Sequence, residues 1–137
     1  MVFFDTNVLV YVHDQHSPFK REVARRLYSA HLYGGSIALS TQVLQEFFVT
    51  VTRKAQQIPV REARNLVSHL AGLNVVSIEP AHVVSAIDLH ARHQLSFWDS
   101  LIIIAAKSAG AQLVLSEDLG HGQTYDGVRV ENPFLTQ

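Results

Sequence analysis

The chain opens with the stretch that decides its fold, Val2-Phe3-Phe4-Asp5-Thr6-Asn7-Val8-Leu9-Val10. An apolar run that reads as a buried first strand ends in a carboxylate, and a second apolar run follows at once. Open α/β sheets bind their ligands at the carboxyl ends of their strands, which is where Asp5 falls. Asp is also a preferred N-cap, and a helix could begin at Thr6. Asp5 alone is therefore open to two interpretations, helix cap or ligand.

Beyond this stretch, short β-rich runs alternate with helical patterns, which favours a parallel sheet covered by helices. Strands are predicted at about 2–5, 36–39, 75–78, 113–115 and 128–130. Helices are predicted from Ser17-Pro18 to Gly34-Gly35, after Ser40 or Thr41, and over about 60–73, 81–93 and 97–109. A Gly-rich loop is expected before the last strand, through Gly120, Gly122 and Gly127. We expect one α/β domain over residues 1–137, a three-layer α/β/α sandwich with a mainly parallel central sheet.

The composition limits the class of protein. The 137 residues are 47% hydrophobic and 17% charged, as in a compact globule. The chain has no cysteine, which excludes disulfides, thiolate metal sites and cysteine nucleophiles. Asp5 interrupts the first apolar stretch, so no secretory signal pattern is present. The longest strong apolar run, 101–106, is far shorter than a membrane span. These features predict a cytoplasmic protein without a membrane segment.

The positive charge is unevenly distributed. The net charge of −1 would by itself argue against a nucleic-acid partner. Most of the basic residues nevertheless lie in the first half of the chain: Lys20, Arg21, Arg25, Arg26, Arg53, Lys54, Arg61 and Arg64. Basic surface around an acidic pocket suits a phosphate-bearing polymer. The alternative is that these residues cover the solvated faces of amphipathic helices.

Two further acids fall on predicted helices. Glu46 lies on the flank of the apolar stripe of its helix, in line with Thr50 and Arg53, where a solvated boundary residue is the usual interpretation. Asp99 stands third after Ser96, which matches a capping box. The helix that follows is apolar all round over 101–106 and should be buried. A carboxylate in its first turn needs a partner, which favours a functional role for Asp99.

The last acids, Glu117 and Asp118, follow the strand at 113–115. Two adjacent acids are often only a turn, but this position repeats that of Asp5, and Ser116 parallels Thr6 as a nearby hydroxyl. Mg²⁺ and Mn²⁺ prefer oxygen ligands, and a bound metal can activate a water for attack on a phosphodiester. Such chemistry requires no side-chain nucleophile.

Other sites are less well supported. The eight histidines form no HExxH motif, and His90 with His93 are expected on an exposed helix end. Trp98 and the Phe47-Phe48 pair are expected in the core. A receiver-like phosphotransfer domain would need a Lys at a late strand end, and none follows Lys107. An Asp-x-Asp phosphatase is excluded because position 7 is Asn.

With Asp5-Thr6-Asn7-Val8-Leu9, Glu46, Phe97-Trp98-Asp99 and Ser116-Glu117-Asp118 in this order, the chain resembles the PIN-domain family. More narrowly it is similar to the VapC-type ribonuclease toxins of toxin–antitoxin modules. The tail, from Gly120-His121-Gly122-Gln123 and Gly127-Val128 to Asn132-Pro133-Phe134, is typical of one branch of these proteins.

The resemblance implies an endoribonuclease that depends on Mg²⁺ or Mn²⁺ and cleaves RNA by a metal-activated water. It implies an acidic quartet of Asp5, Glu46, Asp99 and Asp118, with Thr6, Asn7 and Ser116 as supporting groups. The family's Ser/Thr-x-Asp pattern assigns the fourth role to Asp118 rather than Glu117. It also implies a homodimer and a small antitoxin partner. A non-catalytic RNA-binding or interaction module of the same fold is the alternative.

Overall fold

The computed structural model describes residues 1–135, so the last two residues of the predicted 1–137 domain lie outside the described residues. The strands are β1 (Val2–Phe4), β2 (Ile37–Ser40), β3 (Asn74–Val76), β4 (Leu113–Leu115), β5 (Thr124–Tyr125) and β6 (Val128–Glu131). The helices are α1 (Thr6–Tyr11), α2 (Pro18–Tyr33), α3 (Thr41–Val51), α4 (Val60–Ala71), α5 (Pro80–Arg92) and α6 (Phe97–Ser108).

The strands form one sheet in the order β3-β2-β1-β4-β6-β5, parallel except for β5 against β6. β1 lies between its neighbours, with Val2 opposite Ile37 of β2 on one side and Leu113 of β4 on the other. The chain therefore builds outward from β1 through β2 and β3, and then crosses to the other side of β1 to form β4. Such a reversal opens a crevice at the carboxyl ends of the two strands, here β1 and β4.

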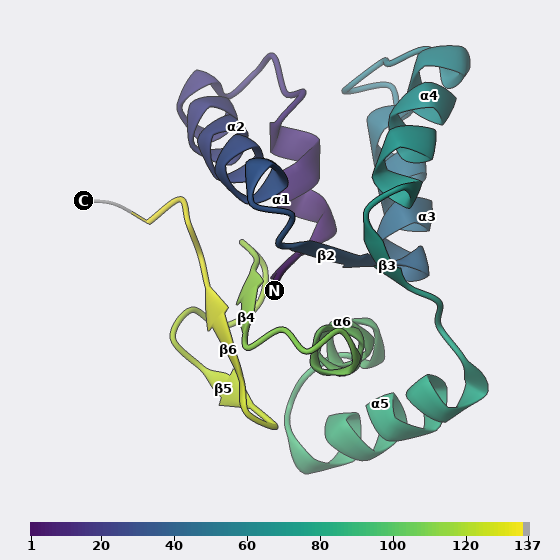
Figure 1. Cartoon of the computed structure of the whole chain (residues 1–137), viewed down its shortest axis with the longest axis vertical. Helices are drawn as coiled ribbons and strands as arrows, with labels where there is room; N and C mark the ends of the chain where they lie inside the picture. Colours follow the sequence, from purple (N-terminus) through teal and green to yellow (C-terminus); the bar gives the residue numbers. More distant parts are fainter. Residues whose placement is uncertain (136–137) are drawn as a thin grey trace.

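Helices cover both faces of the sheet. Figure 1 shows α1 to α4 on one side of the strands, and α5 with α6 on the other. α6 packs on β2, β4 and β6, and its residues 100–106 are all buried. The apolar run at 101–106 is thus a buried helix, as its sequence predicts. The expected three-layer α/β/α sandwich with a mainly parallel sheet is confirmed.

Local signals end the elements close to where the sequence predicts. Ser40 Oγ accepts a hydrogen bond from the Val43 N–H at the start of α3. Ser96 Oγ accepts one from the Asp99 N–H, 3.0 Å away, at the start of α6. Gly110 follows α6 with a φ of +76°, a conformation in which a Cβ would be strained. These caps fix where Asp99 and Glu46 fall on their helices.

Three expectations need correction. The strand predicted at 2–5 ends at Phe4, because Asp5 leaves the strand to cap α1. The predicted Gly-rich loop contains a further strand, β5, which forms a hairpin with β6 through Asp126 and Gly127, both at positive φ. Trp98 is 62% exposed and not in the core, although Phe47 is fully buried. Among the described residues, no helix has the length and apolar character needed to cross a membrane.

Candidate active site

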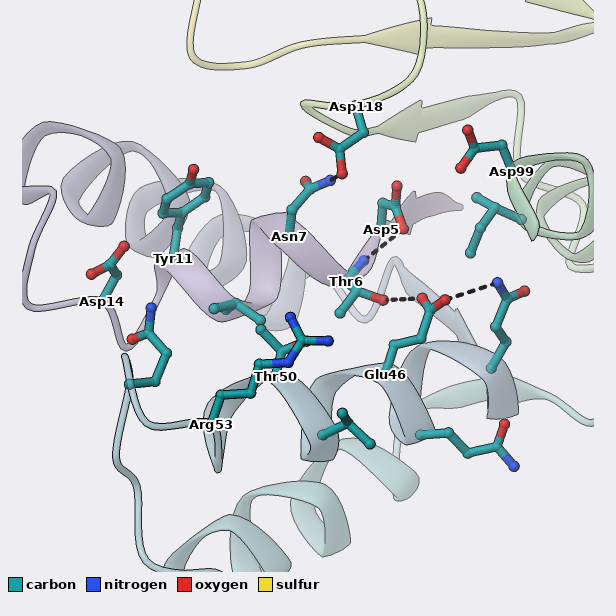
Figure 2. Close-up of a pocket in the computed structure, with 16 residues that line it drawn as sticks. Asp5, Thr6, Asn7, Tyr11, Asp14, Glu46, Thr50, Arg53, Asp99 and Asp118 are labelled. Atoms are coloured by element: carbon teal, nitrogen blue, oxygen red, sulfur yellow. Dashed lines mark hydrogen bonds between the residues drawn. The ribbon is translucent and has the colours of Figure 1, made fainter. Parts of the chain in front are cut away.

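A pocket of about 620 Å³ opens at the carboxyl ends of β1 and β4, between α3 and α6. All four acids that the sequence singles out line it: Asp5, Glu46, Asp99 and Asp118. They come from the N-cap of α1, the middle of α3, the first turn of α6 and the turn after β4. Figure 2 shows these carboxylates around one hollow, together with Thr6 and Asn7. The fold thus brings together groups that lie up to 113 residues apart (118 − 5).

Asp5 is the most deeply placed acid, with only 6% of its surface exposed. One carboxylate oxygen accepts a hydrogen bond from the Thr6 N–H at 2.7 Å, and the other accepts one from Ser116 Oγ at 2.7 Å. Burial raises the pKa of Asp5 from 3.8 to about 6; the two hydrogen bonds lower it, and the nearby Glu46 and Asp99 carboxylates raise it further. Asp5 therefore caps α1 and also lines the pocket beside Glu46 and Asp99.

Glu46 is held in place through both of its oxygens. Thr6 Oγ1 donates to Oε1 at 2.7 Å, and Gln42 Nε2 donates to Oε2 at 3.2 Å (Figure 2). Gln42 is itself buried and also donates to the Trp98 carbonyl, which ties α3 to the start of α6. Gln42 is not among the residues predicted from the sequence, and the signal that could have indicated it is its place one turn before Glu46 on the same helix face.

Asp99 and Asp118 lie on the more open side of the pocket. Burial raises the pKa of Asp99, with the carboxylates of Asp118 and Glu46 adding to the effect. Asn7 Nδ2 donates to Asp118 Oδ2 at 3.0 Å, while Asn7 Oδ1 accepts from the Glu117 N–H at 3.1 Å. Asn7 therefore fixes both the backbone and the side chain of the turn that carries Asp118.

Glu117 has partners of its own. Its carboxylate forms an ion pair with Lys20 of α2 and accepts a hydrogen bond from Tyr11 OH at 2.7 Å. Burial raises the pKa of Tyr11, and the hydrogen bond to Glu117 adds to this. The Lys20 ammonium also lies 5.0 Å from the centre of the Tyr11 ring and 5.7 Å from that of Phe134. No spacing in the sequence could have indicated this cluster, because its members are brought together only by the fold.

The side chains of the pocket offer the kind of donor atoms that a hard divalent cation prefers. In the side-chain positions observed, no three His, Cys, Asp or Glu residues within 1–135 are gathered closely enough to hold a metal ion. Mg²⁺, however, commonly takes only one or two protein carboxylates and fills its remaining positions with water. The acids of the pocket offer oxygen ligands alone, and the pKa values of Asp5 and Asp99 are raised by burial and, in smaller part, by repulsion from neighbouring carboxylates of the pocket. A hard cation with bound waters fits these residues and would relieve that repulsion.

The sequence profile of the PIN domain family matches residues 2–126. A search of curated protein sequences found no match. Among solved structures, the chain is similar to Mycobacterium tuberculosis VapC20, a toxin that cleaves the sarcin–ricin loop, with a TM-score of 0.69, 18% identity, and 86% of this chain and 90% of that chain covered. It is similar to a toxin–antitoxin complex from Klebsiella pneumoniae, with a TM-score of 0.70, 19% identity, and 97% and 98% covered. It is also similar to DNA-bound VapBC from Salmonella typhimurium, with a TM-score of 0.67, 16% identity, and 96% and 97% covered. At these identities the likeness is one of fold.

Proposed function

The chain belongs to the PIN domain family, and from this premise we propose that it is an endoribonuclease that depends on Mg²⁺ or Mn²⁺. One observation carries the proposal: four carboxylates from four separate elements line a single pocket at the topological switch point of the sheet. Carboxylates that repel one another cost the fold stability, so their gathering in one pocket indicates a functional role. The simplest such role is to bind a cation that also contacts a phosphodiester.

In this proposal Asp5, Glu46, Asp99 and Asp118 hold the cation, directly or through water. The cation, when bound, supplies a water of lowered pKa and neutralises charge on the reacting phosphate. Thr6 and Ser116 orient the carboxylates of Glu46 and Asp5 by the hydrogen bonds that they donate. Asn7 does the same for Asp118. The substrate is RNA in a single strand or loop, whose backbone can enter the pocket.

We further propose that the chain acts as the toxin of a toxin–antitoxin pair, as a homodimer that a small antitoxin protein inhibits. The support is that several structures of similar fold are toxin–antitoxin complexes or toxins. Growth of cells that express the chain with and without a cognate antitoxin would test this role separately from the chemistry. An unaffected growth rate with the chain alone would contradict it.

The chemistry is tested by incubating the purified protein with total RNA in Mg²⁺, Mn²⁺ or excess EDTA. Cleavage should require the metal and should be lost in Asp99→Asn. Asp88→Asn is the matched control, since Asp88 is exposed on α5 and lies outside the acidic pocket. Full cleavage in EDTA, or by Asp99→Asn, would refute the mechanism. RNA binding without any cleavage would instead favour a non-catalytic RNA-binding module.

A further inference from the structure

Arg53 is the single cationic side chain among the described residues that line the acidic pocket. It follows the C-terminal end of α3, and Figure 2 shows its side chain reaching from there toward the middle of the pocket. Glu46, Thr50 and Arg53 are spaced by four and three residues, which places them on one face of the helix and its continuation. The pocket thus has an acidic end and an end that carries a guanidinium.

The guanidinium is not used to neutralise the neighbouring acids. Within residues 1–135, no Asp or Glu forms an ion pair with Arg53. Both oxygens of Glu46 already accept hydrogen bonds, from Thr6 and from Gln42. Asp14, another acid of the pocket, is buried and accepts from the His16 N–H at 2.7 Å. Arg53 therefore presents its donors to the pocket rather than to a partner in the chain.

The backbone of Arg53 is well fixed even though the side chain is exposed. Its N–H donates to the Thr50 carbonyl, and its own carbonyl accepts from the N–H groups of Gln56 and Gln57 at 3.1 and 2.8 Å. The Ala55 carbonyl, in the same turn, accepts a hydrogen bond from His16 Nε2–H at 3.1 Å, which ties the turn to the end of the α1–α2 loop. The side chain consequently starts from a defined point on the pocket wall.

We propose that Arg53 binds a phosphate of the RNA strand next to the phosphate that faces the carboxylates. This inference rests on the proposed ribonuclease function. A pocket lined by acids repels a polyanion except where a cation attracts it, and the planar guanidinium matches a phosphate with two parallel hydrogen bonds. The pocket volume of about 620 Å³ is that of a site for a ligand larger than one phosphate. Arg53 thereby aligns the strand so that one linkage lies against the acids.

The test compares Arg53→Ala and Arg53→Lys with Lys54→Ala, which removes one positive charge at the next residue, an exposed position outside the pocket lining. Binding of a labelled single-stranded RNA is measured in Mg²⁺ between 50 and 300 mM salt (roughly the range over which such contacts are screened), in the non-cleaving Asp99→Asn background. Arg53→Ala should weaken binding about tenfold and reduce the slope of log Kd against log salt by about 0.7, the value for one phosphate contact on a single strand. Arg53→Lys should keep the slope and bind with intermediate affinity, and Lys54→Ala should change both quantities less.

Cleavage kinetics separate this proposal from the proposed function. In the otherwise unsubstituted protein, Arg53→Ala should raise KM about tenfold while kcat changes little. If the parent chain cleaves RNA but Arg53→Ala matches Lys54→Ala in KM and in salt slope, the role of Arg53 is refuted and the ribonuclease function stands. If the parent chain neither binds nor cleaves RNA, both proposals fail. A loss of kcat without a change in KM or slope would also refute the phosphate contact.

Discussion

Replacing Asp5 with Asn should make the metal-free protein more stable above neutral pH and not near pH 4. Because burial raises the folded-state pKa of Asp5 from 3.8 to about 6, protonation of this group favours folding. The resulting stabilisation is fully present below pH 3.8 and is lost as the pH rises through about 6. Above pH 7 the ionised, buried carboxylate therefore costs about 3 kcal/mol relative to a neutral group.

The net effect of the substitution is smaller than this. Asn is as good an N-cap as Asp, so its carbonyl can still accept from the Thr6 N–H. Its amide nitrogen would then face Ser116 Oγ, which already accepts from the N–H groups of Asp118 and Leu119. The lost Ser116 hydrogen bond costs about 1 kcal/mol. We expect a net gain of about 2 kcal/mol at pH 8, which falls with pH and reverses near pH 4.

Urea denaturation in EDTA, followed by circular dichroism at pH 8, 6 and 4, measures this difference. Asp88→Asn is the control, because an exposed carboxylate should change the unfolding free energy by less than about 0.5 kcal/mol at each pH. The reasoning is refuted if Asp5→Asn is no more stable than the parent protein at pH 8. It is also refuted if the gain is the same at every pH, since a titrating carboxylate could not produce that result.

Three other predictions concern the metal, the acidic turn and the hairpin. Mn²⁺ at one hundred times its Kd should stabilise the parent protein by about 2.7 kcal/mol, measured as a rise in melting temperature. The rise should be smaller for Asp99→Asn, and equal rises in the two proteins would contradict binding at the pocket. Glu117→Gln, which breaks the ion pair with Lys20, should lower the unfolding free energy by about 1 kcal/mol or less in urea and leave most RNA cleavage intact; loss of all cleavage would show that Glu117 is itself required at the site. Gly127→Ala should destabilise the protein by about 1 kcal/mol in urea because φ is +83° there, whereas Gly34→Ala, at a φ of −80°, should not; similar losses in both would refute the strain argument.

Much of the fold could be predicted from local patterns, because its helices and strands carry strong end signals. Ser96 and Gly110 bound α6 within a residue of the predicted 97–109, and the strand at 113–115 matches β4. The hairpin β5-β6 was overlooked although Asp126-Gly127 is a strong signal for a two-residue turn. The glycines around it were interpreted as a loop, and β5 is only two residues long.

The gathering of Asp5, Asp99 and Asp118 was predicted from their places at strand ends and a helix start, and Glu46, in the middle of α3, was added by the family resemblance; the pocket contains all four. Their roles as metal ligands remain a prediction. The hydrogen bonds that hold them were less accessible to sequence reasoning. Gln42 is polar at a buried helical position, which is a usable signal, but the link from Lys20 to Glu117 spans 97 residues and depends wholly on how α2 packs. Trp98 was misplaced because hydrophobicity indicates burial only on average, and its neighbour Ser100 takes the buried side instead.

The two interpretations of Asp5, helix cap and ligand, turn out not to compete. Each carboxylate oxygen accepts one hydrogen bond in the structure, from Thr6 N–H or from Ser116 Oγ. An ionised carboxylate oxygen has a second lone pair, so each can still offer one to the pocket. The cap and the serine therefore orient Asp5 without using up its capacity as a ligand. Its raised pKa follows from the same placement, because burial and, to a lesser extent, the neighbouring Glu46 and Asp99 carboxylates disfavour its anion, and a bound cation would offset that cost.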